Sequence, residues 1–364
     1  MNYRLATILA REAVSVSANK VIDLTLADPV SQFVVVYEST GVGAGEADGH
    51  AAKCVTKIEL IDGSDVLFSL SGQEAQAVDF YHRKMEPGNL NVYLGGMNAE
   101  MIFNINFGRF LWDTEFAFDP KKFTNPQLKI TIDCDAGGVS SVAGFLTVHA
   151  HIFDGKVISP TGFLMHKEVK NYSLASASHE YTDLPTDYPY RKLFIAAQTY
   201  GAGLEYILNT LKLSEDNDRK IPFSATMFEL LRAIVALQPA YREHVVMSGG
   251  GSGLKFYCTP CYWPKVNIAQ WESSNIAKVA TAWAGDGGRG YIYLEGAGGN
   301  YDISIEGYAP HGAIEIPFGL QDDPADWYDV RALGNLQLDI LSVSGRSSSD
   351  TVQIYLQQHR PYAA

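Results

Sequence analysis

Two sets of segments in this 364-residue chain repeat in the same order, and this duplication constrains the fold more than any other feature. The first set holds the end of a strand, a hydroxyl residue and a glutamate three positions later, and each member recurs 155 residues further on (223 − 68): Phe68-Ser69, Ser71 and Glu74, then Phe223-Ser224, Thr226 and Glu229. A hydroxyl and a glutamate at this spacing form a capping box, in which both side chains satisfy free amides at a helix start. We therefore expect a short helix after each strand.

The second set covers three strand-like segments. Phe103-Asn-Ile-Asn-Phe107-Gly108 matches Ile314-Glu-Ile-Pro-Phe318-Gly319, offset by 211 (318 − 107), and Asn125-Pro-Gln-Leu128-Lys-Ile130 matches Asn335-Leu-Gln-Leu338-Asp-Ile340, offset by 210 (335 − 125). A last strand follows in each copy, at 145–151 and 352–358. Because the offset grows from 155 to 211, the second copy carries roughly 56 extra residues (211 − 155) within about 240–312, a Gly-rich stretch. Such insertions are tolerated in surface loops, and we expect a projection on one end of the second copy.

Between these anchors the chain consists of short alternating or continuous apolar runs separated by Gly, Asn, Asp and Pro, which predicts an all-β chain built from sandwiches. At the N-terminus, Leu5, Ile8, Leu9 and Val14 fall at helical spacing, so residues 2–16 are expected to form a short amphipathic helix. The predicted division is an N-terminal segment at 1–18, a first sandwich at 19–155 and a second at 156–364.

Composition excludes several classes of protein. Hydrophobic residues make up 46% and charged residues 19%, a balance typical of folded globular chains. The net charge of −13 should repel nucleic acid. No apolar run reaches the ~20 residues that a membrane helix needs. We expect no secretory signal, because Arg4 and Arg11 interrupt the first apolar residues. With Lys20 they are too sparse for a nucleic-acid arm, but they could contact lipid or a partner protein.

The chain has four cysteines, of which Cys258-Thr-Pro-Cys261 has the spacing of a redox pair or of half a zinc site. A redox pair normally opens a helix in a βαβ unit, and Tyr262, Trp263 and Pro264 follow here instead. A zinc site needs two more ligands, while Cys54 and Cys134 fall in the other copy. A structural loop, with or without a disulfide, is the favoured interpretation.

Other patterns are equally weak as chemical signals. His149 and His151 share one strand face, but two imidazoles rarely make a strong metal site, so a solvated or interface pair is favoured. Gly285, Gly287 and Gly290 match a dinucleotide motif, yet a strand-like run follows where a helix is required, which favours a hairpin tip. Acid pairs such as Asp133/Asp135, Asp322/Asp323 and Asp326/Asp329 could serve a glycosidase, although acidic loops are common on any soluble surface. We therefore predict no catalytic, cofactor-binding or metal-binding residues.

The duplicated pattern resembles the double jelly-roll major capsid proteins of tailless icosahedral viruses, the lineage of adenoviruses and several membrane-containing bacteriophages. The segments that carry the resemblance are Asn104-Ile-Asn-Phe-Gly-Arg109, Asp119-Pro120 and Phe123-Thr-Asn-Pro-Gln-Leu-Lys-Ile130, with their echo at 314–340. The resemblance implies two tandem eight-stranded jelly-roll sandwiches, each with a short flanking helix, in a subunit that is not an enzyme. It also implies homotrimers that form pseudo-hexagonal capsomers of an icosahedral virion, with residues 1–18 facing the capsid interior and the insertion outside.

The implied partners are further copies of the chain and neighbouring capsomers, together with an internal membrane or minor capsid and vertex proteins, and no sequence-specific nucleic acid. The implied location is the virion, after synthesis in the host cytoplasm. Two other classes remain open: a secreted carbohydrate-active or glycan-binding protein on two β sandwiches, whose aromatic loops would stack on sugars, and a viral spike protein.

Overall fold

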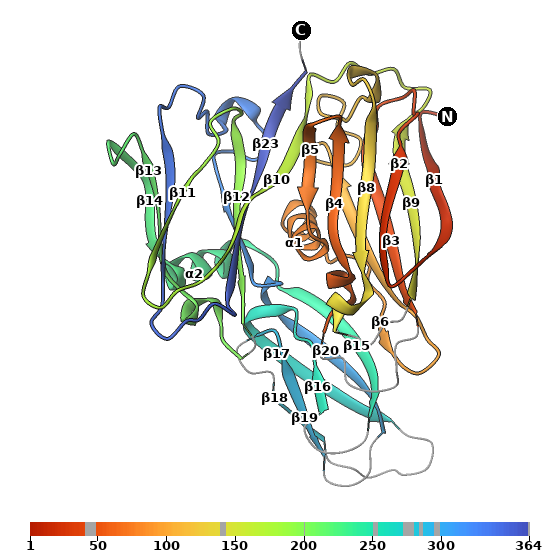
Figure 1. Ribbon diagram of the computed structural model, residues 1–364, viewed down its shortest axis with the longest axis vertical. Helices are drawn as coiled ribbons and strands as arrows, with labels where there is room; N and C mark the ends of the chain where they lie inside the picture. The colour runs from red at the N-terminus through yellow and green to blue at the C-terminus, as the bar shows by residue number, and fades with distance from the viewer. Residues whose placement is uncertain are drawn as a thin grey trace.

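The computed structural model describes residues 1–40, 49–138, 143–199, 201–249, 254–271, 280–283, 287–294 and 299–362. Two β sandwiches stand side by side with a smaller β region below them (Figure 1). One hydrophobic core runs through all three parts. Within the described residues, no helix has the length and apolar character required to span a membrane.

The first roll has eight strands in two four-stranded layers. One layer has the order β1 (Tyr3–Val14), β9 (Ala143–Phe153), β3 (Val30–Thr40) and β7 (Ala99–Asn106), and the other has the order β2 (Ser17–Asp23), β8 (Pro126–Asp133), β4 (Val55–Asp62) and β5 (Asp65–Leu70). The chain changes layer at every connection except the β4–β5 hairpin, which is the jelly-roll topology. Inward side chains such as Phe33, Tyr37 and Phe103 are fully buried between the layers.

The second roll repeats this order strand for strand. One layer has the order β10 (Gly162–Ser173), β23 (Thr351–Pro361), β12 (Tyr190–Gln198) and β21 (Ala313–Pro317), and the other has the order β11 (His179–Asp183), β22 (Leu336–Ser342), β13 (Leu208–Glu215) and β14 (Lys220–Thr226). The repeated segments of the sequence thus fall on equivalent strands, β7 with β21, β8 with β22 and β9 with β23. The predicted duplication and the all-β double jelly-roll class are confirmed.

Each roll also has its flanking helix, α1 (Gly72–Arg83) or α2 (Met227–Leu237), and both capping boxes are formed. Glu74 and Glu229 each accept a hydrogen bond from the backbone amide of the capping residue, at 2.7 Å and 2.8 Å. Short 3₁₀ turns lie at Ala51–Cys54, Pro120–Lys122, Cys134–Gly137, Leu204–Tyr206 and Pro324–Asp326.

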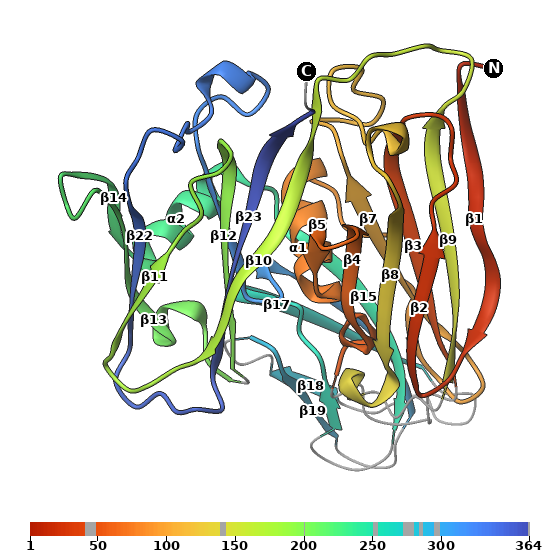
Figure 2. The same ribbon diagram turned by 45° about the horizontal axis from the view of Figure 1, so that its top comes forward.

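The two rolls share one continuous sheet. Strands β5 and β10 run parallel and pair at Phe68 with His166 and at Ser69 with Lys167. This pairing joins one layer of each roll into eight strands in the order β2-β8-β4-β5-β10-β23-β12-β21, and Figure 2 shows β5 and β10 next to each other. The orientation of one roll is therefore fixed relative to the other.

The extra residues of the second copy form the lower β region, at the end of the molecule opposite the two chain termini (Figure 1). Its strands are β15 (Tyr241–Gly249), β16 (Leu254–Phe256), β17 (Pro260–Trp271), β18 (Ala280–Trp283), β19 (Gly290–Leu294) and β20 (Gly299–Pro310). Strand β6 (Asn91–Tyr93) of the first roll pairs in parallel with β15, in a sheet ordered β17-β20-β15-β6. The insertion is thus attached to both rolls.

The predicted N-terminal helix over 2–16 is wrong. Residues 3–14 form β1, which pairs with β9 from Tyr3 opposite Phe153 to Val14 opposite Gly144. Two register shifts, between Thr7 and Leu9 and between Leu9 and Glu12, interrupt the two-residue alternation, so the apolar residues fall at a spacing that imitates a helix. Residues 1–18 are consequently not a segment apart from the first roll.

Candidate functional site at the junction of the two rolls

The Cys258/Cys261 pair lies in a buried loop before and at the start of β17. All four cysteines are free and buried. Burial raises the pKa of the Cys261 thiol to about 11 and that of Cys258 well above its usual value, which is the opposite of a reactive thiolate. The described residues contain no group of three or more His, Cys, Asp or Glu side chains placed to hold a metal ion. Cys258 and Cys261 are both free, so the disulfide that the sequence left open is not formed.

The histidine pair lies on the outward face of β9. Thr7 contacts His149 at 3.3 Å, and the Trp112 ring meets His151 edge-on with ring centroids 5.5 Å apart. Burial, followed by the neighbouring His149, lowers the pKa of His151. Of the glycine string, Gly285 lies outside the described residues, and Gly290 begins strand β19, so no helix follows it.

Local backbone contacts account for acidic residues in all three candidate pairs. Asp133 accepts from the amide of Asp135, and Asp323 from the amide of Ala325, as caps of short turns. Asp326 accepts from the amide of Leu320 at 2.6 Å. Hydrogen bonds from Arg331 lower the pKa of Asp329 to about 2. These carboxylates stabilise loops.

The three basic residues near the N-terminus have acidic partners. Arg11 forms a bidentate contact with Glu38, Lys20 pairs with Glu12, and Arg4 lies 3.7 Å from Asp154. They are therefore largely neutralised within the first roll.

The charged residues that the sequence analysis missed lie between the rolls. Lys192 of β12 and Glu315 of β21 form an ion pair whose side chains are 4% and 2% exposed. The Lys192 ammonium also donates to the carbonyl oxygen of Tyr81 in α1, 3.0 Å away, and Tyr81 donates its hydroxyl to the carbonyl of Ala313 in β21 at 2.8 Å. Burial lowers the pKa of Lys192 to about 8. Buried hydrogen bonds thus hold the helix of the first roll against the second roll.

Arg191 adds a second contact of this kind. Its guanidinium lies 3.1 Å from both His82 of α1 and Gln357 of β23, and it donates to the carbonyl of Gln321 at 3.0 Å. Burial lowers the pKa of Arg191 to about 10, and that of His166 to about 3. One signal was present in the sequence, since an Arg-Lys pair stands within the apolar strand Tyr190–Gln198 and charged residues are rarely buried without partners.

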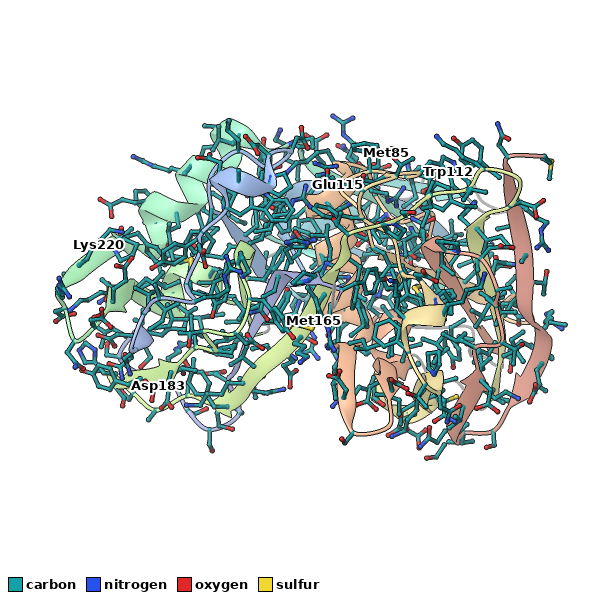
Figure 3. All side chains as sticks on the ribbon, turned by 90° about the horizontal axis from the view of Figure 1, so that it is seen from above. Met85, Trp112, Glu115, Met165, Asp183 and Lys220 are labelled. Atoms are coloured by element: carbon teal, nitrogen blue, oxygen red, sulfur yellow. The ribbon has the colours of Figure 1, made fainter. Side chains whose placement is uncertain are left out.

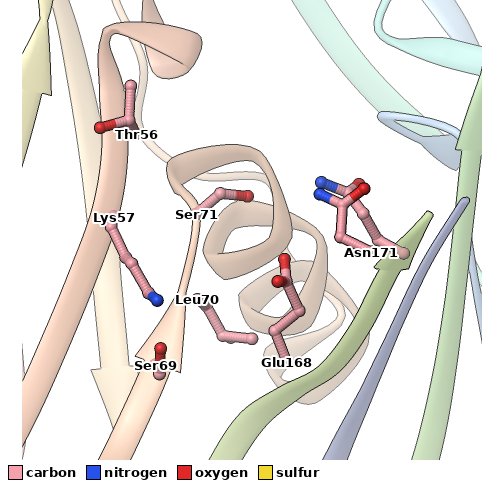
Figure 4. A pocket seen from close by; sticks show the side chains of 8 residues that line it. Thr56, Lys57, Ser69, Leu70, Ser71, Glu168 and Asn171 are labelled. Carbon is pink, nitrogen blue, oxygen red and sulfur yellow. The ribbon is translucent and has the colours of Figure 1, made fainter. Parts of the chain in front are cut away.

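A polar pocket of about 210 Å³ opens where β5 meets β10 (Figure 4). It is lined by Thr56, Lys57, Ser69, Leu70, Ser71, Glu168, Asn171 and Gln353. Beside it, Glu74 is almost fully buried, and burial followed by the nearby Glu168 carboxylate raises the pKa of Glu74 to about 8. Glu74, an acid that binds its proton more tightly than usual, therefore lies beside this pocket at the contact between the two rolls.

Polar contacts also hold the insertion against the first roll. Glu243 of β15 accepts from the side chain of Asn91 in β6 at 3.4 Å, and His50 lies 3.8 Å from Glu243. Gln73 of α1 donates to the hydroxyl of Tyr257 at 2.9 Å. Together with the shared sheet, these contacts join the two rolls and the insertion into one structural unit.

No protein-family model and no curated protein matches the sequence. Solved structures match over nearly the whole chain. The crystal structure of the STIV MCP, from Sulfolobus turreted icosahedral virus, has a TM-score of 0.64 at 11% identity and covers 99% of this chain and 97% of that chain. The VP54 protein of PBCV-1 gives 0.59 at 11% identity, covering 98% and 94%.

The major capsid protein P2 of bacteriophage PM2 gives a TM-score of 0.55 at 9% identity, covering 98% of both chains. At such low identity these matches show the fold. Because the coverage is nearly complete on both sides, they include both rolls and their order. The chain therefore has the double jelly-roll fold found in these virus capsid proteins.

Proposed function

We propose that this protein is a major capsid protein, the structural subunit of an icosahedral virion that assembles as homotrimeric, pseudo-hexagonal capsomers. The single observation that supports this most is the match to capsid proteins over both rolls and nearly the full length of each chain. The rigid junction fits this role, because a tile needs its two rolls held at one fixed angle. Three such subunits supply six rolls, enough for a six-sided tile.

The candidate acids within the described residues do not support the enzymatic alternative. A glycosidase needs two carboxyl groups facing each other across a substrate cleft. The candidate acids of the sequence are instead engaged in loop contacts, such as Asp326 with the amide of Leu320 and Asp329 with Arg331. The four thiols are free and buried, which suits synthesis in a reducing host cytoplasm better than secretion.

On this proposal the insertion faces outward and the end with both chain termini faces the capsid interior. The connection 154–161 and the loops after β7 and β21 lie at that end (Figure 1). They carry the exposed apolar side chains of Phe110, Val157 and Leu320, which are 57%, 93% and 67% exposed. Such loop tips suit contact with an internal membrane or a minor capsid protein.

Electron microscopy of the purified full-length chain tests the proposal. Threefold tiles with a pseudo-hexagonal outline, or closed particles, are the expected result. A glycan array and a hydrolysis screen run on the same preparation address the carbohydrate-active alternative. Monomers by microscopy together with glycan binding or cleavage would overturn the proposal.

A further inference from the structure

The contact between the two rolls within one chain has a counterpart that no described residue of the same chain fills. The offset of 211 makes Ile105 equivalent to Ile316, and because these two residues pair with Phe33 and Leu193, Phe33 is equivalent to Leu193. Ala6 pairs with Ala150, which faces Phe33, and in the second roll Lys167 pairs with Leu356, which faces Leu193. Ala6 therefore holds in the first roll the place that Lys167 holds in the second. By the same register, Leu5 corresponds to His166 and Thr7 to Glu168.

Inside the chain, the outward face of the β10-β23-β12-β21 layer covers α1. Residues 74–81 of this helix are all buried, and Tyr81 is bound by Lys192 and by the carbonyl of Ala313. Next to α1, strand β5 pairs in parallel with β10. A helix and an edge strand of the first roll are thus closed off by the second roll.

The equivalent helix of the second roll is uncovered in the described part of the chain. Phe228 and Leu237 of α2 are 44% and 74% exposed, although α2 contains only two charged residues, Glu229 and Arg232. Leu237 corresponds to the partly buried His82 of α1 (237 − 155). A small apolar groove between α2 and β21 is lined mainly by Leu230, Ala233, Ile234, Leu237, Ile316 and Pro317. Strand β14 ends its sheet, and its Ile221 is 46% exposed.

The surface that would cover this helix exists at the other side of the molecule. The outward face of the β1-β9-β3-β7 layer corresponds to the face that covers α1. It presents Leu5, 57% exposed, and the partly exposed Val34, Val36, His149 and His151. In Figure 1, β14 and α2 lie at the left and β1 at the far right, and Figure 3 shows Lys220, the first residue of β14, at the outer left edge. The two surfaces cannot meet within one copy.

We infer that α2 and β14 of one copy pack against the β1-β9-β3-β7 face of the next copy, repeating between subunits the contact that joins the two rolls within a subunit. Strand β14 then runs parallel to β1, with Phe223 beside Leu5 and Ser224 beside Ala6, as Phe68 lies beside His166. This inference rests on the proposed function and adds the surface that a capsomer uses.

The chemistry of the two faces agrees with this pairing. Phe223 beside Leu5 is an apolar pair. Within one chain, Glu74 lies near the carboxylate of Glu168. At the proposed contact between copies, the equivalent Glu229 lies beside the hydroxyl of Thr7, so the contact between copies has no such like-charge repulsion. The contact is head to tail, and such heterologous contacts form a closed ring when the rotation between copies permits it.

Thiol crosslinking between two single variants tests the pairing. Leu5→Cys and Phe223→Cys proteins, co-expressed so that they assemble together and then treated with a short bismaleimide, should give a covalent dimer, while each variant alone should give none. The native thiols are buried and do not compete. Tyr181→Cys, on the exposed part of β11, replaces Phe223→Cys as a matched control and should not crosslink to Leu5→Cys. A crosslink in Phe223→Cys alone would indicate a twofold contact and overturn the inference.

Leu237→Glu provides a second readout, since this exposed residue can carry a charge without disturbing the folded subunit. We expect it to raise the concentration needed for half-assembly about tenfold or more, while Tyr181→Glu, at a side chain 56% exposed on β11, leaves assembly unchanged. If wild-type trimers form but neither the crosslink nor the Leu237→Glu effect is found, the inference fails and the proposed function stands. If the wild type never assembles, the proposed function itself fails.

Discussion

Glu74 and Glu229 occupy the same position in two copies of one capping box, yet they lie in opposite environments. Glu74 is 2% exposed and burial raises its pKa to about 8, whereas Glu229 is fully exposed and hydrogen bonds from the Thr226 backbone and hydroxyl lower its pKa. The difference arises because the second roll covers α1, while no described residue of the chain covers the outer face of α2, on which Phe228, Glu229 and Leu237 are exposed. One motif thus serves the helix start in both rolls, and its carboxyl group has a raised pKa at the junction and a lowered pKa on α2.

The buried Glu74 predicts a loss of stability as pH rises. An acid whose pKa is about 8 when folded and about 4.5 when unfolded holds its proton more tightly in the folded chain, so the free energy of unfolding falls between those pH values and is level below them. Glu74→Gln keeps the capping geometry and removes this loss. We expect the variant to match the wild type near pH 4.5 and to exceed it by on the order of 1–4 kcal/mol near pH 8.5, measured by urea unfolding.

Glu229→Gln is the matched control, with the opposite sign. A lowered pKa means that the ionised carboxylate stabilises the folded chain at pH values above its unfolded pKa, and that this contribution is lost as pH falls through the folded pKa. The variant should therefore be slightly less stable than the wild type at neutral pH. Parallel shifts of both variants with pH would contradict the account of the junction.

The Lys192–Glu315 pair predicts a large effect of a single substitution. Glu315→Gln leaves the Lys192 ammonium buried without its carboxylate, and Lys84 also loses one of its two partners, the Glu315 carboxylate 2.9 Å away. We expect a loss of about 3–5 kcal/mol in the free energy of unfolding. Glu180→Gln removes the acid of the more exposed pair with Lys170 and should cost less than about 1 kcal/mol. Similar losses in the free energy of unfolding for both variants would show that the buried pair contributes no more to stability than the exposed pair.

The buried thiols predict slow labelling. Native protein should react with a thiol reagent only as fast as it unfolds, and four thiols should react at once in denaturant, because burial raises the pKa of Cys54 to about 12 and that of Cys261 to about 11. A chelator should leave the unfolding midpoint unchanged. Rapid labelling of two thiols in the native protein, or destabilisation by the chelator, would restore the redox or zinc interpretation of Cys258 and Cys261.

Local patterns in the sequence were enough to predict the duplication, both helices and the all-β class. Each capping box depends on residues within one turn, and each inward strand face shows in the alternation of apolar residues, as in Leu128 and Ile130 of β8. Strand β1 was missed because its two register shifts move apolar residues out of that alternation. A pattern of period two predicts a strand only while the pairing remains regular.

The junction could not be predicted, because its contacts join residues far apart in the chain. Lys84 and Glu315 are 231 positions apart, and His166 pairs with Phe68 across the boundary between the rolls. The strand Tyr190–Gln198 does carry a local sign, a charged pair in an apolar run, which indicates buried partners without naming them. Glu74 and Glu229 look identical in sequence, and only the tertiary contact distinguishes them.

The mass of the purified full-length protein in solution tests the central claim, that this chain is a tile-forming subunit, most directly. Sedimentation or native mass spectrometry at micromolar concentration should show a species of about 120 kDa, three times the 39.9 kDa of one chain, with little free subunit. A stable species of 39.9 kDa alone, or one of twice that mass, would contradict it.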